Sequence, residues 1–180
     1  MSTMNTYTGK IFDPMNMTEE DIAIEDIAHA LSLTCRGGGH VRYFYSVAQH
    51  SINCMLEAKA RGWSDRMQLA CLLHDASEAY ISDVIRPVKA HLSNYIEIED
   101  SIMAVIYRRF RLGDLTNEET AMWKKIDDEI MDFELKSLMR GEENRPLKKL
   151  YSVPDVSQKF WGEVADEFAG YVRSLSGVSC

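Results

Sequence analysis

The sequence lacks three features that would place it outside the ordinary globular proteins. No apolar run approaches the roughly 20 residues that a membrane-spanning helix needs. The opening stretch, MSTMNTYTGKIFDPM, contains no apolar segment of the kind that forms a secretory signal. The four cysteines, at positions 35, 54, 71 and 180, show no CxxC spacing. We therefore expect a cytoplasmic chain with reduced thiols and no membrane partner.

Positive charge is also scarce. The 20 Lys and Arg residues face 28 Asp and Glu, which gives a net charge of −8. Affinity for a phosphate backbone comes mostly from basic surface, so this balance argues against a nucleic-acid partner. Two stretches nevertheless contain no acid: Ile27 to Leu56, which includes Arg36, and Val84 to Ile96, which includes Arg86 and Lys89. These are the parts of an acidic chain best suited to face an anion.

The pattern is helical nearly throughout, and 180 residues predict one domain over positions 1–180, with the motif-bearing core at about 20–140. The predicted helices cover residues 24–33, 46–61, 65–80, 94–112, 116–140 and 157–175. Capping boxes at Ser46 with Gln49 and at Thr116 with Glu119 mark two of the starts. The best candidate for a strand is VRYFYSV. We expect an all-α fold of about six main helices.

Ionisable groups directly follow the apolar run ACLL, in the segment HDASEAYISD that spans residues 74–83. Burying an unpaired carboxylate costs several kcal/mol, so something should compensate Asp75. With helical spacing, His74 and Glu78 lie one turn apart on one face, and Asp75 lies at its edge. An isolated His–Asp pair is more often a core histidine beside a solvated carboxylate, but a metal ion would also satisfy both groups.

Two other predicted helices offer groups of the same kind. His50 lies one turn inside the second helix, beside the small side chains of Ser51 and Cys54, which leave room around an imidazole. The fifth helix carries Asp127 and Asp128, and periodicity leaves open which of the two faces inward. Two imidazoles and two carboxylates suit Mn, Fe, Co, Ni or Zn better than Mg or Ca. The sequence therefore predicts a divalent transition metal as the cofactor.

The order His50, then His74 and Asp75, then an aspartate on the fifth helix resembles the H…HD…D signature of the HD-domain metal-dependent phosphohydrolases. HDASEAYISD also fits HDxxExxxxD, the form found in bacterial HD-domain 5′-deoxynucleotidases. With IEDIAHALS, YSVAQHS and RPVK added, the chain is similar to phage, prophage and bacterial hydrolases related to those nucleotidases over about residues 7–139. The resemblance implies a single HD-domain helical fold.

The same resemblance implies a metal site. The ligands it implies are His50, His74, Asp75 and Asp127. In the family the last aspartate precedes a glutamate by seven residues, and Asp127 precedes Glu134 by that spacing. Asp127 is therefore preferred to Asp128.

Roles in catalysis and substrate binding are implied in the same way. Arg36 matches the arginine that clamps the phosphate. Glu78 matches the glutamate that acts on the attacking water or the leaving group, and Asp83 matches the aspartate near the sugar. Arg86 and Lys89 are further candidates for binding the substrate. Family members carry an aromatic residue directly after the arginine, where this chain has a glycine, so no stacking is expected from that position.

The function implied is the release of phosphate from nucleoside 5′-monophosphates, with deoxyribonucleotides preferred. One alternative is a (deoxy)nucleoside triphosphohydrolase or another nucleotide phosphodiesterase of the superfamily. An alternative of another class is a non-catalytic HD-domain protein that senses a nucleotide. The family's habit also predicts a homodimer, with the segment SIMAVIY (101–107) and the aromatic residues of the last helix as candidate surfaces.

Overall fold

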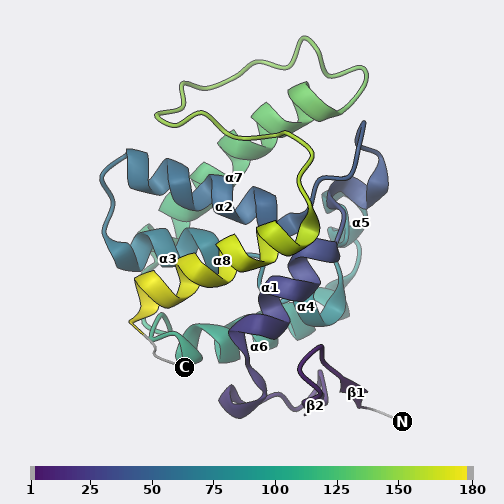
Figure 1. Ribbon diagram of the computed structural model, residues 1–180, viewed down its shortest axis with the longest axis vertical. Helices are drawn as coiled ribbons and strands as arrows, with labels where there is room; N and C mark the ends of the chain where they lie inside the picture. The colour runs from purple at the N-terminus through teal and green to yellow at the C-terminus, as the bar shows by residue number, and fades with distance from the viewer. Residues whose placement is uncertain (1–2, 178–180) are drawn as a thin grey trace.

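The computed structural model describes residues 3–177, and nearly all of its regular secondary structure is helical (Figure 1). Its longer helices are α1 (Ile24–Leu33), α2 (Val47–Ala60), α3 (Asp65–Leu73), α6 (Ser93–Arg109), α7 (Asn117–Leu138) and α8 (Trp161–Ser176). The short elements are β1 (Met4–Asn5), β2 (Ile11–Phe12), the 3-10 turns η1 (Glu19–Asp21) and η2 (Arg36–Gly39), and the one-turn helices α4 (Glu78–Ile81) and α5 (Arg86–Lys89). The predicted all-α fold with about six main helices is confirmed.

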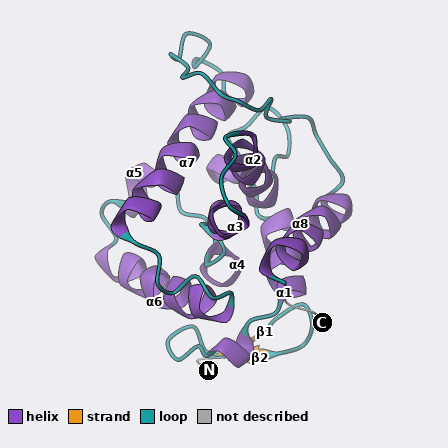
Figure 2. Cartoon of the chain, turned by 90° about the vertical axis from the view of Figure 1, so that its left-hand side faces the viewer, coloured by secondary structure: helices purple, strands orange, loops and turns teal. Residues whose placement is uncertain are grey.

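Helices α2 and α3 lie side by side at the centre of the molecule (Figure 2). Helix α7 packs against both from one side, and α1 and α8 cover them from the other. Leu72 and Leu73 of α3, Val47 of α2 and Phe168 of α8 are completely buried between these layers. The middle of α2 and the end of α3 are therefore strongly enclosed, and both of these regions carry candidate site residues.

Three of the four cysteines lie among the residues that the structure describes. Cys35, Cys54 and Cys71 are free thiols, and Cys180 lies outside the described residues. Cys54 and Cys71 are buried in a small apolar cluster with Ile126 of α7. Within residues 3–177, no helix combines the length and the apolar character that crossing a bilayer requires.

Side-chain caps fix where three of the helices begin. At α2, the Ser46 oxygen accepts a hydrogen bond from the Gln49 N–H (3.2 Å), and the Gln49 side chain accepts one from the Ser46 N–H (3.3 Å). Thr116 and Glu119 form the same box at α7, and Ser64 caps α3. These caps satisfy N–H groups that a first turn leaves without partners. These three helices therefore start where the sequence predicts.

The third helix is shorter than predicted, because it ends at Leu73 and not near Tyr80. After Leu73 the chain continues in tight turns with hydrogen bonds between residues three apart, such as Ala76 N–H to Leu73 O and Glu78 N–H to Asp75 O (both 3.0 Å). In this geometry side chains three apart line up. Asp75 and Glu78 therefore point to the same side, whereas a regular helix would have placed Asp75 at the edge.

Residues 41–46 of the segment VRYFYSV form a loop, and Val47 begins α2, which corrects the strand prediction. Within the described residues its one bridge joins Ser46 to Cys35, and here the Arg36 N–H donates to the Tyr45 carbonyl (2.9 Å). Tyr45 is completely buried, and its hydroxyl donates to Glu134 (2.7 Å). The apolar alternation in this segment thus serves to anchor a loop through one buried tyrosine.

The last helix starts at Trp161 instead of Ser157. The Ser157 N–H donates to the Asp155 carboxylate (2.9 Å), and the Ser157 carbonyl accepts from the Gln49 side chain (2.9 Å). These contacts hold Ser157 in an extended strap, residues 139–160, that links α7 to α8. Because these hydrogen bonds hold Ser157 in an extended conformation, the helix begins four residues later, at Trp161.

The side chains suggested for a homodimer surface are largely used within the chain itself. Ile102 and Ile106 of the segment SIMAVIY and Phe168 of α8 are buried in the main apolar core. An amphipathic helix has one apolar face, and here that face is covered within the chain, so the homodimer stays a prediction. Phe160 and Trp161 remain exposed, at 61% and 37%.

A buried carboxylate on α2 fastens the strap to the helices. Glu57 is completely buried and accepts hydrogen bonds from the N–H groups of Tyr151 (3.0 Å) and Ser152 (2.8 Å). Its other partner is Arg61, at 2.8 Å. Burial raises the pKa of Glu57, but the hydrogen bonds from Ser152 and Tyr151 outweigh this effect and hold the pKa below its usual value.

Replacing Glu57 with glutamine should lower the free energy of unfolding by about 2–3 kcal/mol at neutral pH, because an amide donor then faces the N–H donors of the strap. The lowered pKa means that the carboxylate's stabilisation is present above its ordinary value of 4.5 and is lost as the pH falls through the folded-state pKa. Urea unfolding of both proteins at several pH values should show the gap closing on the acid side.

The matched control is Asp166→Ala, at an exposed position of α8. It should change the unfolding free energy by less than about 0.5 kcal/mol. Equal losses in the two variants would show that Glu57 does not fasten the strap.

Candidate metal centre

Four ionisable side chains from three parts of the chain meet at one point. His50 lies in α2, His74 and Asp75 directly follow α3, and Asp127 lies in α7. The His50 Nε2 atom is 3.1 Å from Asp127 Oδ1 and 3.9 Å from Asp75 Oδ2. The His74 Nε2 atom is 3.1 Å from the same Asp75 oxygen and 3.8 Å from the same Asp127 oxygen. The structure thus brings together the four residues that the sequence proposed as ligands.

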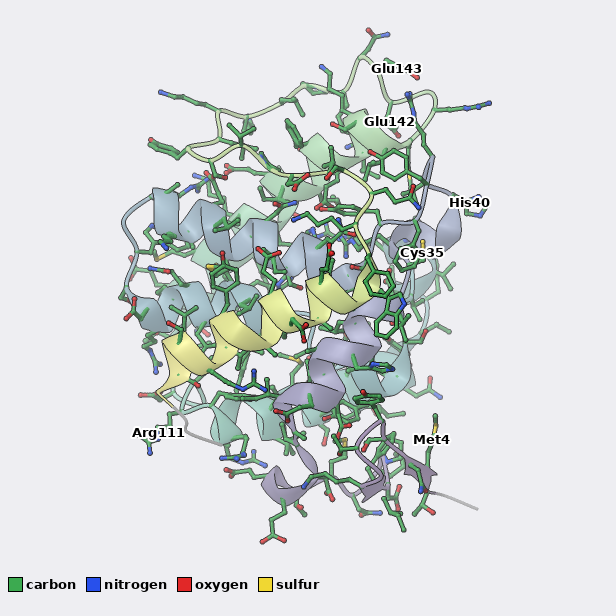
Figure 3. All side chains as sticks on the ribbon, viewed as in Figure 1. Met4, Cys35, His40, Arg111, Glu142 and Glu143 are labelled. Atoms are coloured by element: carbon green, nitrogen blue, oxygen red, sulfur yellow. The ribbon has the colours of Figure 1, made fainter. Side chains whose placement is uncertain are left out.

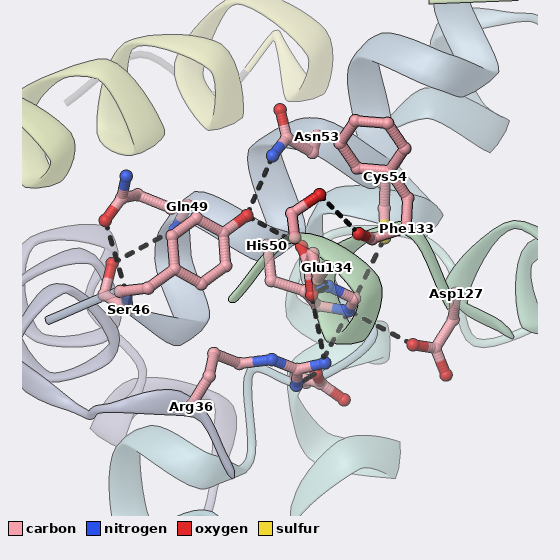
Figure 4. A network of polar contacts seen from close by, with 12 residues as sticks. Arg36, Ser46, Gln49, His50, Asn53, Cys54, Asp127, Phe133 and Glu134 are labelled. Atoms are coloured by element: carbon pink, nitrogen blue, oxygen red, sulfur yellow. Dashed lines mark hydrogen bonds and ion pairs between the residues drawn. The ribbon is translucent and has the colours of Figure 1, made fainter. Parts of the chain in front are cut away.

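The other nitrogen of each ring has an acceptor as its partner. His50 Nδ1 lies 2.9 Å from the Glu134 carboxylate, as Figure 4 shows, and His74 Nδ1 lies 2.8 Å from the carbonyl of Cys71. A carbonyl or an ionised carboxylate can only accept, so the proton of each neutral ring sits on Nδ1. Both Nε2 atoms then present lone pairs to the cluster, the arrangement that metal-binding histidines show.

Two lone pairs and two carboxylate oxygens converge here, and acceptors alone repel one another. The His74 Nε2 atom is buried and has no hydrogen-bond partner among residues 3–177. Two atoms that are each about 2.1 Å from one metal ion and about 90–110° apart are separated by about 3.0–3.4 Å. The 3.1 Å contacts of His50 and His74 fall in that range. Each histidine therefore has one carboxylate oxygen at the separation expected of two ligands of one metal ion, whereas the cross contacts, at 3.8 and 3.9 Å, are longer.

Protons are the alternative to a cation at this point. Burial lowers the pKa of His74, but the nearby Asp75 and Asp127 outweigh it and raise the pKa well above its usual value. Burial raises the pKa of Asp127, but its contacts with His50 and His74 hold it well below its usual value. Because a metal would displace the histidine protons, metal binding should release protons and weaken as the pH falls.

A thiol also lies beside the cluster, although the sequence did not single it out as a ligand. Cys54 Sγ is 3.6 Å from His50 Nε2, and the ligand atoms of His50, Cys54 and His74 all lie within 4.8 Å of one another. This buried group can hold a metal ion. Burial and then Asp127 raise the pKa of the Cys54 thiol well above its usual value, so the thiol is neutral in the absence of a cation. Each histidine Nε2 atom also has a carboxylate oxygen at 3.1 Å, which is nearer than the 3.6 Å between His50 and the thiol.

Helix α7 turns its two neighbouring aspartates in different directions. The side chain of Asp127 is 15% exposed and reaches the histidines through Oδ1. The side chain of Asp128 is 61% exposed, and its partner is Arg86, at 2.6 Å. Asp127 is therefore the aspartate that joins the cluster, a choice that helical periodicity left open.

Glu134 orients His50 from one end of a buried hydrogen-bond chain. The Asn53 side chain donates to the Tyr45 hydroxyl (2.8 Å), which donates to Glu134 (2.7 Å), which in turn accepts from His50. Burial raises the pKa of Glu134, but His50 and other neighbours bring it below its usual value. The sequence reading gave Glu134 no role. The available signal was its distance of seven residues from Asp127, which puts both on one helix face.

Arg36 reaches the cluster from η2. Its guanidinium lies 3.4 Å from an Asp75 oxygen and 3.7 Å from a Glu134 oxygen. Burial lowers the pKa of Arg36, but Glu134 and Asp75 raise it further, so the side chain stays charged. Gly37 follows with φ at 60°, and a Cβ atom there would lie 2.7 Å from the end of the Met139 side chain. The backbone conformation therefore favours glycine, whereas the flexible end of Met139 could move aside.

A cleft of about 1140 Å³ opens beside the cluster. The walls come from η2, from the segment that contains α5, and from α6 and α7. Trp123, Met131 and Tyr107 contribute apolar surface to the cleft, and Arg36 and Arg86 contribute positive charge. This mixture of apolar and charged groups is typical of a small-molecule site.

Glu78 and Asp83 line the same cleft. Glu78 is 5% exposed, and its Oε2 atom has no hydrogen-bond partner in the described part of the chain. Burial raises the pKa of Glu78 well above its usual value, and the charges of Asp75 and Asp83 add to this. Burial also raises the pKa of Asp83. Glu78 is therefore a carboxyl group that retains its proton at a higher pH than an exposed glutamate does.

The two remaining candidates for binding the substrate already have acidic partners. Arg86 donates to Asp127 Oδ2 (2.5 Å) and to Asp128 Oδ1 (2.6 Å). Lys89 donates to Glu99 (2.5 Å). Both basic groups line the cleft, so an anion there would have to compete with carboxylates for them.

Other histidines lie away from the cluster. His40 is exposed at the edge of the molecule, just after η2 (Figure 3). His29 stacks on Tyr7 with ring centroids 3.7 Å apart and meets the edge of Trp161. These contacts give His29 a role in packing the N-terminal segment.

Comparison with known proteins finds relatives but no family. No family model matches the chain. The chain is 39% identical to the uncharacterized protein YfdR of Escherichia coli (strain K12) over 112 residues, which are 62% of this chain and 60% of the relative. It is 43% identical to the uncharacterized protein RCAP_rcc00048 of Rhodobacter capsulatus over 110 residues, which are 58% of this chain and 56% of that relative. The chain thus spans less than two thirds of the length of the curated relatives it matches.

Ligand removal tests the cluster directly. His74→Ala and Asp127→Ala should each lower the affinity for Mn²⁺ or Co²⁺ by more than about 100-fold, since even the loss of a partner behind a ligand costs about 10–100-fold. Asp128→Ala should lose at most a few-fold in affinity, the contribution of an exposed ion pair, because Asp128 contacts Arg86 and none of the four clustered groups. Metal analysis after dialysis and titration calorimetry give the comparison. An empty Asp128→Ala protein beside a loaded Asp127→Ala protein would reverse the assignment.

Proposed function

We propose that the chain is a metal-dependent phosphohydrolase of the HD type. One observation carries the proposal: His50 and His74 have their Nδ1 atoms tied to acceptors, and both Nε2 atoms face Asp75 and Asp127 at 3.1–3.9 Å. The order of these residues along the chain resembles the signature of that family, which supports the same conclusion.

Arg36 favours a phosphate ester as the substrate. A divalent ion is balanced in charge by Asp75 and Asp127, so the dianion of a phosphate monoester needs a further cation. The contacts of Arg36 with Asp75 and Glu134, at 3.4 and 3.7 Å, are long and leave several guanidinium N–H donors free. A planar guanidinium also matches two phosphate oxygens at once, which an ammonium group cannot do.

The residues around the cluster supply the other elements of a hydrolysis. A bound transition metal would provide a water of lowered pKa and would polarise a phosphoryl oxygen. Glu78, buried and with a raised pKa, holds a proton that it delivers to the departing 5′ oxygen. Arg36 holds the phosphate in place during this transfer. The apolar wall around Trp123 limits the access of other water.

A nucleoside 5′-monophosphate, with deoxyribose preferred, is the substrate that we propose. With the metal neutralised by two aspartates, Arg36 offsets one of the two charges of a phosphate dianion, and a triphosphate would bring roughly two more negative charges to the site. Asp83 follows α4 at the wall of the cleft, where it accepts a hydrogen bond from the sugar 3′-hydroxyl. An added 2′-hydroxyl would then need its own partner, and an unsatisfied hydroxyl costs about 1–3 kcal/mol.

A triphosphohydrolase is the second candidate, favoured by the size of the cleft. At about 1140 Å³ it exceeds the upper end of the usual range for small-molecule pockets, about 1,000 Å³. Arg86 and Lys89 on its wall could take additional phosphate groups if they left their acidic partners. A nucleotide sensor without turnover would need the ligands but not the buried proton on Glu78.

Removing the acid should separate catalysis from metal binding. Glu78→Ala should keep its metal but lose about 10²–10⁴-fold in kcat, since it removes a proton-transfer group. Asp100→Ala, an exposed acid on the same cleft, should keep both. Phosphate release and metal content measured on the same preparations give the answer. Loss of metal from Glu78→Ala would make Glu78 a ligand and sink its role as the acid.

The substrate is tested by comparing kcat/KM for dAMP, AMP and dATP with one metal. We expect dAMP to lead AMP by at most about 10²-fold, because a pocket rejects an extra hydroxyl only that strongly, and Asp83→Ala should close the gap. Faster turnover of dATP would favour the triphosphohydrolase. Tight binding of all three without turnover would favour the sensor.

A further inference from the structure

We propose that Arg86 is a latch shared between the candidate ligand Asp127 and an anionic group of the substrate. The inference deepens the function proposed above and rests on it, because it takes Asp127 as a metal ligand and a phosphate as the anion. It concerns the segment of residues 82–92, called here the lid segment, which contains α5 and forms one wall of the cleft.

The latch is a fork that joins two neighbouring carboxylates. One guanidinium nitrogen of Arg86 lies 2.5 Å from Asp127 Oδ2, and the other lies 2.6 Å from Asp128 Oδ1. The second oxygen of Asp127 faces His50 at 3.1 Å. Arg86 therefore holds the outer oxygen of Asp127, so that the inner oxygen points to the histidines. Asp128, although outside the cluster, anchors the arginine that orients a candidate ligand.

The lid segment has little besides charge to hold it in place. Helix α5 contains no buried residue, and Ile85 and Val88 are 40% and 46% exposed. Its second attachment is the ion pair of Lys89 with Glu99 on α6. A segment fastened by ion pairs at the mouth of a cleft responds to any anion that competes for those cations, whereas an apolar contact would not respond.

Its N-terminal end is strained. Ser82 has φ at 70° and ψ at 159°, a backbone region that is essentially restricted to glycine. The Tyr95 hydroxyl holds the Ser82 carbonyl at 2.6 Å. Strain of this kind persists only where the surrounding contacts impose it, so loss of the arginine fork should loosen the whole lid segment.

Exchange of partners is possible because Arg86 has more donors than the fork uses. A guanidinium has five N–H groups, and the fork occupies two of them in the described contacts. Arg36 lines the same cleft from another element, η2. An anion between Arg36 and Arg86 can draw Arg86 from Asp127, and it then replaces Asp127 as the bond that keeps the lid segment closed.

The rate of trypsin cleavage reports whether the lid segment is held in place, and this measurement does not require phosphohydrolase activity. Cleavage at Arg86 is blocked by Pro87, whereas the Lys89–Ala90 bond is a regular site. We expect slow cleavage there in the metal-loaded wild type and faster cleavage in both Arg86→Gln and Asp128→Asn. Inorganic phosphate should restore protection in Asp128→Asn, which retains the arginine, but not in Arg86→Gln.

Phosphate affinity supplies the second readout. Asp128→Asn removes a competitor for Arg86 and should tighten inorganic phosphate by about two- to five-fold, the contribution of an exposed ion pair. Asp100→Asn removes the same charge from the cleft without touching the fork, so it controls for the general change in charge. Equal tightening in Asp100→Asn, or phosphate protection of Arg86→Gln, would overturn the latch.

These outcomes are independent of the proposed activity. The phosphate-dependent protection with no phosphohydrolase activity would support the latch and count against the proposed function. Activity together with unchanged proteolysis in Arg86→Gln would do the reverse. Metal content measured in each variant shows whether the candidate ligands are still in place.

Discussion

The candidate site depends on how the fold places the protons of two imidazole rings. His50 and His74 each give the Nδ1 proton to a buried acceptor, so their lone pairs meet two carboxylates. That arrangement is unfavourable on its own, since four acceptors share one enclosed space. Packing of α2 and α3 against α7 imposes it, and a divalent cation or added protons relieve it. The chemistry proposed for this chain follows from that negative potential, which Arg36 and Arg86 offset only in part.

Much of the fold could be predicted because the signals are local. Ser46, Ser64 and Thr116 satisfy the first N–H groups of their helices, and a cap acts within one turn. The early end of the third helix could not be predicted in this way. The tight turns after Leu73 keep a helical appearance in sequence, and tertiary packing decides between hydrogen bonds three and four residues apart. VRYFYSV was misread for a related reason, since alternation cannot show that one tyrosine is an anchor.

For the candidate site too, some residues could be predicted from sequence motifs, and others became apparent only from contacts between distant parts of the chain. The motif and its spacing pointed to the four clustered residues, and the seven-residue step to Glu134 selected Asp127 over Asp128. The contact of Arg86 with Asp127 could not be predicted from the sequence. It joins residues 41 positions apart, and the short segment that carries Arg86 has no characteristic pattern. Cys54 was noted only for its size. A buried thiol near an imidazole becomes visible as a possible ligand only when distances are known.

Three polar side chains on one face of helix α2 fix its position along its axis. His50 is fixed by Glu134 of α7, Asn53 by the backbone of Asp155 (3.0 Å), and Glu57 by residues 151 and 152 of the strap. A slide of one residue along the axis, 1.5 Å, or the accompanying turn of 100°, would break all three at once. The strap contributes no candidate catalytic group, yet it locks the register of the helix that presents a candidate ligand. Insertions or deletions in the strap would therefore change the position of His50 in the cluster, although they lie far from it in the chain.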